Sequence, residues 1–177
     1  MKFLLALGAS CILVFAACAA DGGNSGVESP LKVDLAEVVA SGRVAPVDGI
    51  TSAGQPDAAA FKVFADSGYA AVIDMRTADE DRGLDEKAVV EGLGMEYVVM
   101  PIDRDDITFE NALVLDELIA GYDDPVLVHC ASANRVGALL ALRSSLNGAD
   151  DAAALEAGRE GGMTRLESKV REALSHD

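Results

Sequence analysis

The sequence predicts an α/β domain in which a mainly parallel central sheet is flanked by helices. Short apolar runs alternate with stretches of helical periodicity, and turn-forming residues separate the two kinds of segment. Strands that alternate with helices in this way form parallel sheets, because each helix returns the chain to the start of the next strand. The chain has 177 residues, which is enough for one such domain but not for a second full one.

The expected elements follow one another along the whole chain. A short helix over residues 34–40 and a strand within 43–52 precede the turn-forming AGQP at 53–56. A helix ending near Gly68 then leads into the apolar run YAAVIDM at 69–75, a buried strand. The remaining elements repeat this alternation: helix 85–93, strand 97–101, helix 108–120, strand 126–129, and helices 135–146, 152–158 and 163–174.

The N-terminus is typical of an exported protein. Lys2 precedes an apolar run over residues 3–20, and the polar DGGNSG follows, as in a secretory signal. Residues 15–17 lead into Cys18 as in a bacterial lipobox, so we expect a lipid on Cys18 that anchors the protein in the periplasm or cell envelope. Cleavage near residue 20 and an uncleaved anchor remain open. The predicted organisation is a signal and lipobox at 1–18, a flexible linker at 19–33 and one domain at 34–177.

Charge and cysteine content exclude several function classes. Thirty acidic against 14 basic side chains give a net charge of −16, which argues against nucleic acids and anionic membrane surfaces as partners. After export and lipidation, Cys130 is the one remaining thiol, so no intramolecular disulfide is expected. The sequence has neither a GxxxxGK[ST] motif nor a His, Cys and carboxylate cluster with metal-ligand spacing, and we expect no metal or cofactor.

The segment after the last predicted strand has the features of an anion site. The strand PVLV leads to His129 and Cys130, the small residues ASAN form a tight loop, and Arg135 opens the apolar helix VGALLAL. Loop amides and a helix N-terminus favour a bound anion and a thiolate. Arg135 offers a two-pronged grip on phosphate oxygens. Alternatively, Cys130 is a small buried hydrophobe and Arg135 a surface cation.

HCxxxxR after a buried strand resembles the cysteine-dependent tyrosine and dual-specificity phosphatase superfamily. GQP at 54–56, VIDMR at 72–76 and GMEYVVMPID at 94–103 resemble its beta-lactamase-hydrolase-like branch, and together these segments span about residues 47–146. The resemblance implies a tyrosine-phosphatase-like three-layer sandwich and hydrolysis of a phosphorylated protein or small molecule. It also implies roles for the residues of the loop: Cys130 as nucleophile, Arg135 as phosphate ligand, His129 as support from behind, and Ala131, Ser132, Ala133 and Asn134 as the amide cradle.

Three departures from that family pattern leave other functions open. Four residues separate Cys130 from Arg135, whereas most tyrosine phosphatases have five, and the shorter spacing also occurs in rhodanese-type sulfurtransferases. Ala133 replaces a glycine, which disfavours a left-handed backbone, and Val136 replaces a hydroxyl residue. The alternatives are a sulfurtransferase that carries a persulfide on Cys130 and a degenerate oxyanion-binding module with little turnover.

The expected proton donor is a carboxyl group at the same edge of the sheet. MPIDRDD places Asp103, Asp105 and Asp106 just after a strand, and we favour Asp103 as the general acid. The alternative is that Asp103 is a turn carboxylate or the partner of Arg104. Arg76, at the end of VIDMR, either reaches the site or pairs with a nearby acidic residue, Asp79 or Glu80.

Overall fold

The structure is a computed structural model that describes residues 31–176. The predicted signal and lipobox, Cys18 and the linker up to residue 30 lie outside the described residues. The predicted linker boundary at residue 33 differs from the structure: the Val33 amide donates to the Ser52 carbonyl at 3.0 Å, and the Lys32 amide donates to the Glu160 carbonyl at 3.0 Å. Among residues 31–176, no helix has the length and apolar character needed to cross a membrane.

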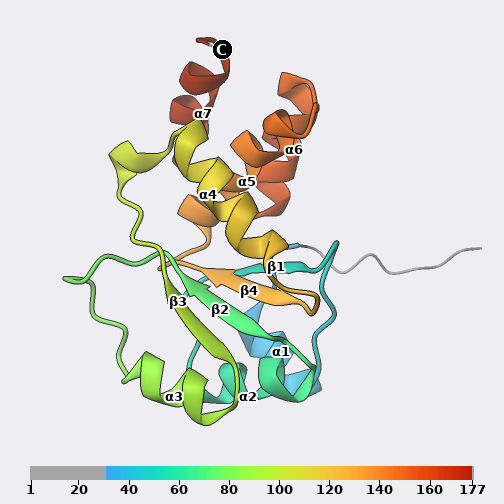
Figure 1. Cartoon of the computed structure of the whole chain (residues 1–177), viewed down its shortest axis with the longest axis vertical. Coiled ribbons are helices and arrows are strands. Elements are labelled where there is room, and N and C mark those ends of the chain that lie inside the picture. The colour runs from blue at the N-terminus through green and yellow to red at the C-terminus, as the bar shows by residue number, and fades with distance from the viewer. Residues whose placement is uncertain (1–30, 177) are drawn as a thin grey trace, which may run out of the picture.

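The centre of the fold is a four-stranded sheet (Figure 1). Its strands are β1 (Ile50–Ala53), β2 (Ala71–Asp74), β3 (Glu96–Val99) and β4 (Val126–His129), and their order across the sheet is β1-β4-β2-β3. All three strand pairs are parallel. Because β4 is inserted between β1 and β2, the residues that follow it emerge in the middle of the carboxyl edge. In parallel sheets such a switch in strand order is where ligands bind.

Helices cover both faces of this sheet, as Figure 1 shows. One face carries three helices: α1 (Leu35–Ser41), α2 (Ala58–Asp66) and α3 (Glu86–Gly92). The other carries four: α4 (Phe109–Ala120), α5 (Asn134–Leu146), α6 (Asp151–Glu160) and α7 (Glu167–Leu174). A short 3₁₀ helix, η1 (Arg104–Asp106), joins β3 to α4. The predicted three-layer α/β sandwich with a parallel sheet is confirmed.

The core consists of two apolar layers that follow the two-residue period of the strands. Ile73 and Val128 face the layer beneath α4 to α7, whereas Val72 and Leu127 face the layer that contains Phe61 of α2 and its neighbours. All of these side chains are fully buried. Burial of each large apolar side chain contributes about 1.5–3 kcal/mol, so both faces of the sheet stabilise the edge that carries the loop after β4.

Close contact between α5 and α6 depends on a glycine inside α5. A Cβ atom at Gly137 would lie 2.3 Å from the Met163 amide nitrogen and 2.4 Å from the Gly158 carbonyl oxygen. Both distances are far shorter than van der Waals contact, so only glycine lets the two backbones approach this closely. The contact fixes residues 161–166, which follow α6, beside the start of α5.

Two predicted elements begin several residues later than expected. The strand predicted within residues 43–52 begins only at Ile50, because Asp48 and Gly49 adopt φ angles of 48° and 77° and form a turn. The helix predicted over 163–174 begins only at Glu167. The Asn134 side-chain oxygen accepts from the amides of Thr164 and Leu166 at 2.7 and 3.4 Å, which holds this segment as a loop.

Candidate functional site

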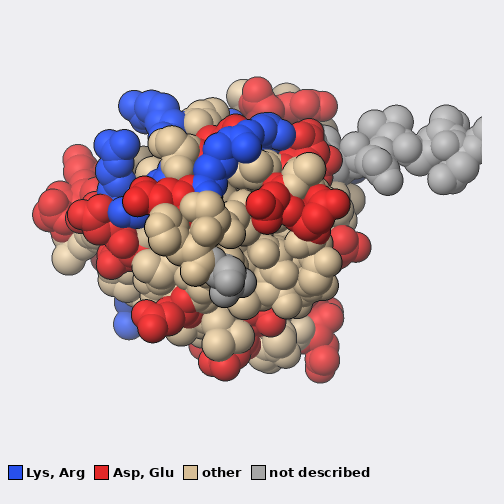
Figure 2. Space-filling view, turned by 90° about the horizontal axis from the view of Figure 1, so that it is seen from above, with Lys and Arg blue, Asp and Glu red and all other residues tan. Residues whose placement is uncertain are grey.

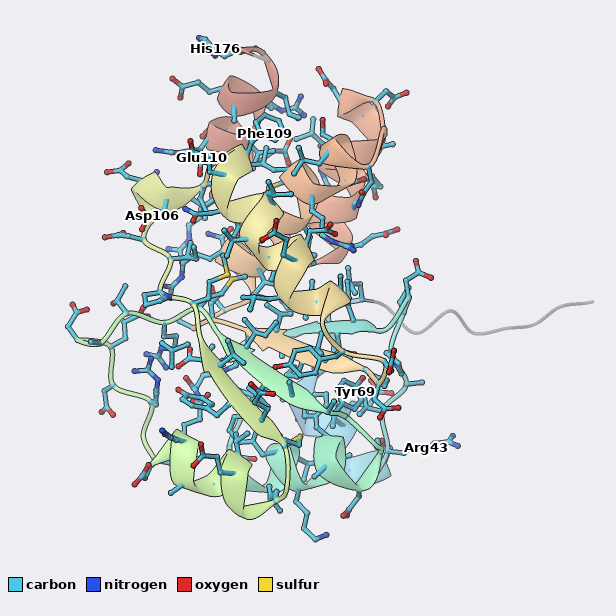
Figure 3. All side chains as sticks on the ribbon, viewed as in Figure 1. Arg43, Tyr69, Asp106, Phe109, Glu110 and His176 are labelled. Atoms are coloured by element: carbon cyan, nitrogen blue, oxygen red, sulfur yellow. The ribbon has the colours of Figure 1, made fainter. Side chains whose placement is uncertain are left out.

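A cavity of about 490 Å³ lies at the carboxyl edge of the sheet. Four segments form it: the loop after β2, η1 with the residue before it, the loop after β4, and the loop before α7. Figure 3 labels Asp106, the last residue of η1. It also labels Phe109 and Glu110, the first two residues of α4, into which the chain continues. The residues lining the cavity are Thr77, Asp79, Glu80, Asp103, Arg104, Ala131, Ser132, Asn134, Arg135, Arg165 and Leu166.

The loop after β4 begins with Cys130, whose side chain is 1% exposed. The GQP segment lies against this loop. The Gln55 amide donates to the Ala131 carbonyl at 3.3 Å, and Gly54 pairs with Ser132 in an isolated bridge. A Cβ atom at Gly54 would lie 3.3 Å from the Ala131 oxygen, so this position favours a residue without a side chain.

Ala133 turns the loop into α5 through a left-handed backbone. Its φ and ψ angles are 66° and −5°, although its side chain disfavours this conformation. The expectation that an alanine here would limit positive φ is therefore wrong: the chain adopts it, at a cost of about 1–2 kcal/mol. The Ala133 methyl group faces Gly162, where an added Cβ atom would lie only 2.6 Å away. The loop before α7 thus leaves room for the strained residue.

Arg135, the second residue of α5, is held by one edge of its guanidinium group. Its Nη1 and Nη2 atoms donate to the two carboxylate oxygens of Glu80 at 2.6 and 2.7 Å, and Nη1 also donates to the Ile102 carbonyl at 2.9 Å. These bonds leave the Nε–H and one Nη2–H free, and those two form the second fork of the guanidinium. The hydrogen bonds to the Glu80 carboxylate raise the pKa of Arg135, and a thiolate at the neighbouring Cys130 acts in the same direction.

Glu80 is in turn fixed by a chain of side chains that ends behind the loop. Hydrogen bonding to Arg135 lowers the pKa of Glu80 to about 2, and Arg76 donates to the same carboxylate at 3.2 Å. Arg76 also donates to the Gln55 side chain at 2.5 Å, and Gln55 donates to Glu86 at 2.7 Å. The other Glu86 oxygen lies 2.6 Å from His129 Nε2. Arg76 therefore pairs with Glu80, one of its two predicted partners.

His129 is fully buried at the end of β4, where it connects this strand to the first turn of α3. A carboxylate only accepts, so we assign the proton to Nε2, and Nδ1 then has no partner within residues 31–176. Its burial behind the loop is compatible with the predicted supporting role, which stays a prediction.

Asp74, Glu86 and His129 bring their ligand atoms within 4.8 Å of one another, a spacing that could hold a metal ion. The fold assembles this cluster from three distant segments, so no motif in the sequence announces it. Donors from the protein already satisfy both carboxylates. Asp74 accepts from Arg82 at 2.6 Å and from Tyr97 at 2.7 Å, and Glu86 accepts from Gln55. We interpret the cluster as support for the loop, and the expectation of no metal stays a prediction.

Of the three predicted carboxylates, only Asp103 lines the cavity. It caps η1 in a reciprocal arrangement with Asp106, whose carboxylate accepts from the Asp103 amide at 2.8 Å. Asp105 instead forms a salt bridge with Lys169 of α7 at 2.8 Å. Asp79 also lines the cavity, but a hydrogen bond from Thr77 lowers its pKa, which is unfavourable for a proton donor. Position in the cavity therefore favours Asp103, and the catalytic role of Asp103 stays a prediction.

Sequence comparisons give relatives for part of this domain, and no family model matches the chain. The chain is 29% identical over 103 residues to a beta-lactamase hydrolase-like protein of Agrobacterium fabrum, covering 56% of the chain and 24% of that protein. It is 33% identical over 99 residues to a beta-lactamase hydrolase-like protein of Xylella fastidiosa, covering 54% and 23%. The chain thus spans about a quarter of the length of these curated relatives.

Solved structures decide the fold family. A putative phosphatase from Neisseria meningitidis superposes with a TM-score of 0.61 at 20% identity, over 70% of this chain and 92% of that one. P. aeruginosa TpbA in complex with pTyr gives 0.55 at 19% identity, over 72% and 86%. The chain has the fold of the tyrosine-phosphatase-like superfamily. Tk-PTP in its active form, at 0.54 and 18% identity over 72% and 91%, agrees, and the predicted resemblance is confirmed.

Within this tyrosine-phosphatase-like fold, one departure has a clear structural setting. Val136, which stands where a hydroxyl residue was expected, is fully buried in the apolar layer beneath the helices. It therefore contributes to the core and gives the loop no hydroxyl group.

Sequence reasoning missed two carboxylates of the site, Glu80 as the partner of Arg135 and Glu86 as the partner of His129. A signal for Glu80 existed in TADEDR, an acidic segment that follows a strand at the same edge of the sheet where the loop after β4 begins. Glu86 gave no such signal, because an acidic residue in the first turn of a helix is common.

Proposed function

We propose that the chain is a cysteine-dependent phosphatase that hydrolyses phosphomonoesters through a phosphocysteine intermediate. The observation that supports this most strongly is the position of Arg135. Glu80 and the Ile102 carbonyl hold one edge of its guanidinium, and the free edge remains available beside Cys130 for two phosphate oxygens. A guanidinium fixed in this way suits a planar, two-pronged contact with an oxyanion better than contact with a single sulfur atom.

In the proposed reaction, the Cys130 thiolate attacks phosphorus in line with the departing alcohol. The sulfur–phosphorus bond forms while the phosphorus–oxygen bond to the alcohol breaks, and Asp103 gives its proton to that oxygen. Arg135 and the amides of residues 131–135 stabilise the charge on the three remaining oxygens. A water molecule then attacks the phosphocysteine, Asp103 takes up its proton, and inorganic phosphate leaves with the thiolate restored.

The first experiment measures phosphate release from a panel of phosphomonoesters by the full chain. We expect measurable activity that Cys130→Ser abolishes and that vanadate or inorganic phosphate inhibits by competition. Phosphotyrosine belongs in the panel, because P. aeruginosa TpbA was solved with pTyr. Absence of activity on every ester, with tight oxyanion binding retained, would support a degenerate binding module instead.

The second experiment tests Asp103 as the proton donor. Asp103→Asn should lower kcat by roughly 10²–10⁴-fold on an alkyl phosphate, whose leaving group needs protonation, and much less on nitrophenyl phosphate. Asp105→Asn is the matched control, since Asp105 bonds to Lys169 and does not line the cavity. Equal losses on both substrates would show that Asp103 acts only through its cap on η1.

A sulfurtransferase is the second candidate, and the four-residue spacing between Cys130 and Arg135 favours it. A persulfide on Cys130 adds a single atom and would leave the free fork of Arg135 without a matching partner. We therefore expect thiosulfate to cyanide transfer to be trivial beside phosphoester cleavage. Efficient cyanide turnover without any phosphoester cleavage would overturn the phosphatase proposal.

We also propose that the protein is exported and anchored in the cell envelope by a lipid on Cys18. The apolar run over residues 3–20 and the small residues before Cys18 support this. The full chain should fractionate with membranes and incorporate a labelled fatty acid, and Cys18→Ala should abolish the label. Wild-type protein that remains unlabelled would contradict the anchor.

A further inference from the structure

Two arginines at the cavity have no side-chain partner in the part of the chain that the structure describes. Arg104 of η1 and Arg165 of the loop before α7 line the cavity, and both are exposed. Within residues 31–176, neither guanidinium group makes a hydrogen bond or a salt bridge to another side chain. Six other described arginines do have carboxylate partners: Arg76, Arg82, Arg135, Arg143, Arg159 and Arg171.

Two free arginines at the same cavity are unexpected in so acidic a protein. The chain has 30 acidic side chains for 14 basic ones, so carboxylates are available to almost every cation. Figure 2 shows acidic side chains spread across the face seen from above, with lysines and arginines gathered towards one side. Two unpaired guanidinium groups at one cavity are therefore best explained by a ligand that brings its own negative charge.

The backbone of each arginine is fixed although its side chain is free. Arg104 lies between Asp103 and Asp106, the two residues of the reciprocal cap on η1. Arg165 lies between Thr164 and Leu166, whose amides both donate to the Asn134 side chain. The salt bridge between Asp105 and Lys169 also brings η1 next to α7. Both guanidinium groups thus extend from well-defined anchor points on neighbouring walls of the same cavity.

The remaining charges of the cavity leave room for a second anion. Glu80 pairs with Arg135, so the remaining charged side chains of the cavity are Asp79, Asp103, Arg104 and Arg165. In the proposed reaction Asp103 holds the proton for the leaving group, and at that stage the two arginines outnumber the one remaining carboxylate, Asp79. A volume of about 490 Å³ lies within the range of sites for small molecules, and such a site accommodates more than one phosphoryl group.

We propose that Arg104 and Arg165 form a second anion subsite, and that the preferred substrates carry a second phosphate or carboxylate near the phosphate that is cleaved. This inference rests on the proposed phosphatase function. Arginine suits the role because its fork binds phosphate and carboxylate with two parallel hydrogen bonds. The exposure of both side chains makes each contact sensitive to salt.

The test compares matched pairs of probes on the full chain. One pair is fructose 6-phosphate and fructose 1,6-bisphosphate; the other is a phosphotyrosine peptide flanked by alanine and the same peptide flanked by glutamate. Wild type should prefer the doubly anionic member of at least one pair by about 10-fold or more in kcat/KM, and salt should weaken this preference. The pair that shows the preference identifies whether the second charge belongs to a small molecule or to a peptide.

Arg104→Gln and Arg165→Gln should each reduce the preference by about 3–10-fold, mainly through KM, because each removes a charge-assisted contact that solvent partly screens. Arg43→Gln is the matched control: Arg43 is also exposed and has no side-chain partner among the described residues, and Figure 3 places it on the opposite flank of the molecule. The control should leave both members of each pair unaffected.

Binding separates this proposal from the phosphatase proposal. Dissociation constants of the same probes are measured on Cys130→Ser by calorimetry, with and without the arginine substitutions. Arginine-dependent preference in binding without turnover by wild type would overturn the phosphatase and leave the subsite intact. Equal affinity and equal kcat/KM for both members of both pairs would overturn the subsite, as would equal losses on both members after either arginine substitution.

Discussion

The cavity contains two kinds of arginine, and the contrast between them defines how the site is built. Arg135 is partly buried and bonded along one edge to Glu80 and the Ile102 carbonyl. Arg104 and Arg165 are exposed and have no side-chain partner within residues 31–176. The first has a single orientation, set by the protein before any ligand binds. The other two can change rotamer to suit the ligand.

This difference matches two separate tasks. Stabilisation of a transition state requires groups that are already oriented, since reorientation during the reaction raises its barrier. Recognition of the rest of a substrate tolerates flexible groups, because their contacts are the same before and during the chemical step. Substitution of the fixed arginine should therefore lower kcat, whereas substitution of a free arginine should raise KM.

The largest effect is expected from Arg135→Lys. Lysine keeps the charge but lacks the fork, so it cannot bond to Glu80 and to two phosphate oxygens at once. We expect kcat on phenyl phosphate to fall by about 10³-fold. Arg104→Lys, the matched conservative change at a free arginine, should alter kcat by less than a few fold. Similar losses for the two variants would mean that the two kinds of arginine do not differ in function.

Glu80→Gln should have the next largest effect. The amide keeps the shape of the carboxylate but has one acceptor oxygen in place of two. Arg135 therefore loses one of the two hydrogen bonds through which residue 80 orients it. Misplacement of a catalytic group by about 1 Å costs on the order of 10²-fold in rate, and we expect a loss of this size in kcat. Full activity of this variant would show that the paired carboxylate oxygens of Glu80 are not needed to orient Arg135.

Gly162→Ala tests the contact between the loops that carry the two kinds of arginine. An added methyl group would lie 2.6 Å from the Ala133 Cβ atom, on a backbone with a φ angle of 97°. Strain and overpacking should together lower the free energy of unfolding by roughly 2–4 kcal/mol. The double variant with Ala133→Gly should recover part of this loss in urea denaturation. Strict additivity of the two substitutions would rule out a contact between these loops.

The smallest effect concerns acid stability. The pKa of Glu80 is lowered from 4.5 to about 2 in the folded protein, so its salt bridge stabilises the fold above the ordinary pKa and is lost as pH falls through that interval. The difference in unfolding free energy between wild type and Glu80→Gln should be constant above about pH 5 and shrink towards pH 2. Urea titrations at several pH values measure it, and a difference that does not change with pH would contradict the pairing.

Sequence reasoning was most successful where structure is local. The strand, loop and helix around Cys130 are contiguous in the chain, and the strand predicted at 126–129 has the observed bounds. Alternation of strands and helices was sufficient to predict the parallel sheet. The strand predicted within 43–52 was too long, because periodicity did not detect the turn at Asp48 and Gly49.

Contacts between distant segments were not predictable in the same way. The partner of Arg135 lies 55 positions away in a loop, and the partner of His129 lies 43 positions away in a helix. Several acidic residues near each partner have the same chemistry, so composition could not select among them. The left-handed backbone of Ala133 also contradicted its local propensity, because the fold leaves space for its methyl group at Gly162.

Gly137, which has no side chain, determines which parts of the site can move relative to one another. Because α5 and α6 touch through their backbones at this glycine, the loop after β4 and the loop before α7 are joined into a single rigid wall. After β2 the Met75 amide bonds to the His129 carbonyl at 2.9 Å, and beyond that point side-chain bonds, such as those of Arg135 to Glu80, join the loop after β2 and η1 to that wall. A substrate too large for the cavity would therefore be admitted by displacement of the Glu80 side of the site, while the distance between the amide cradle and Arg165 stays constant.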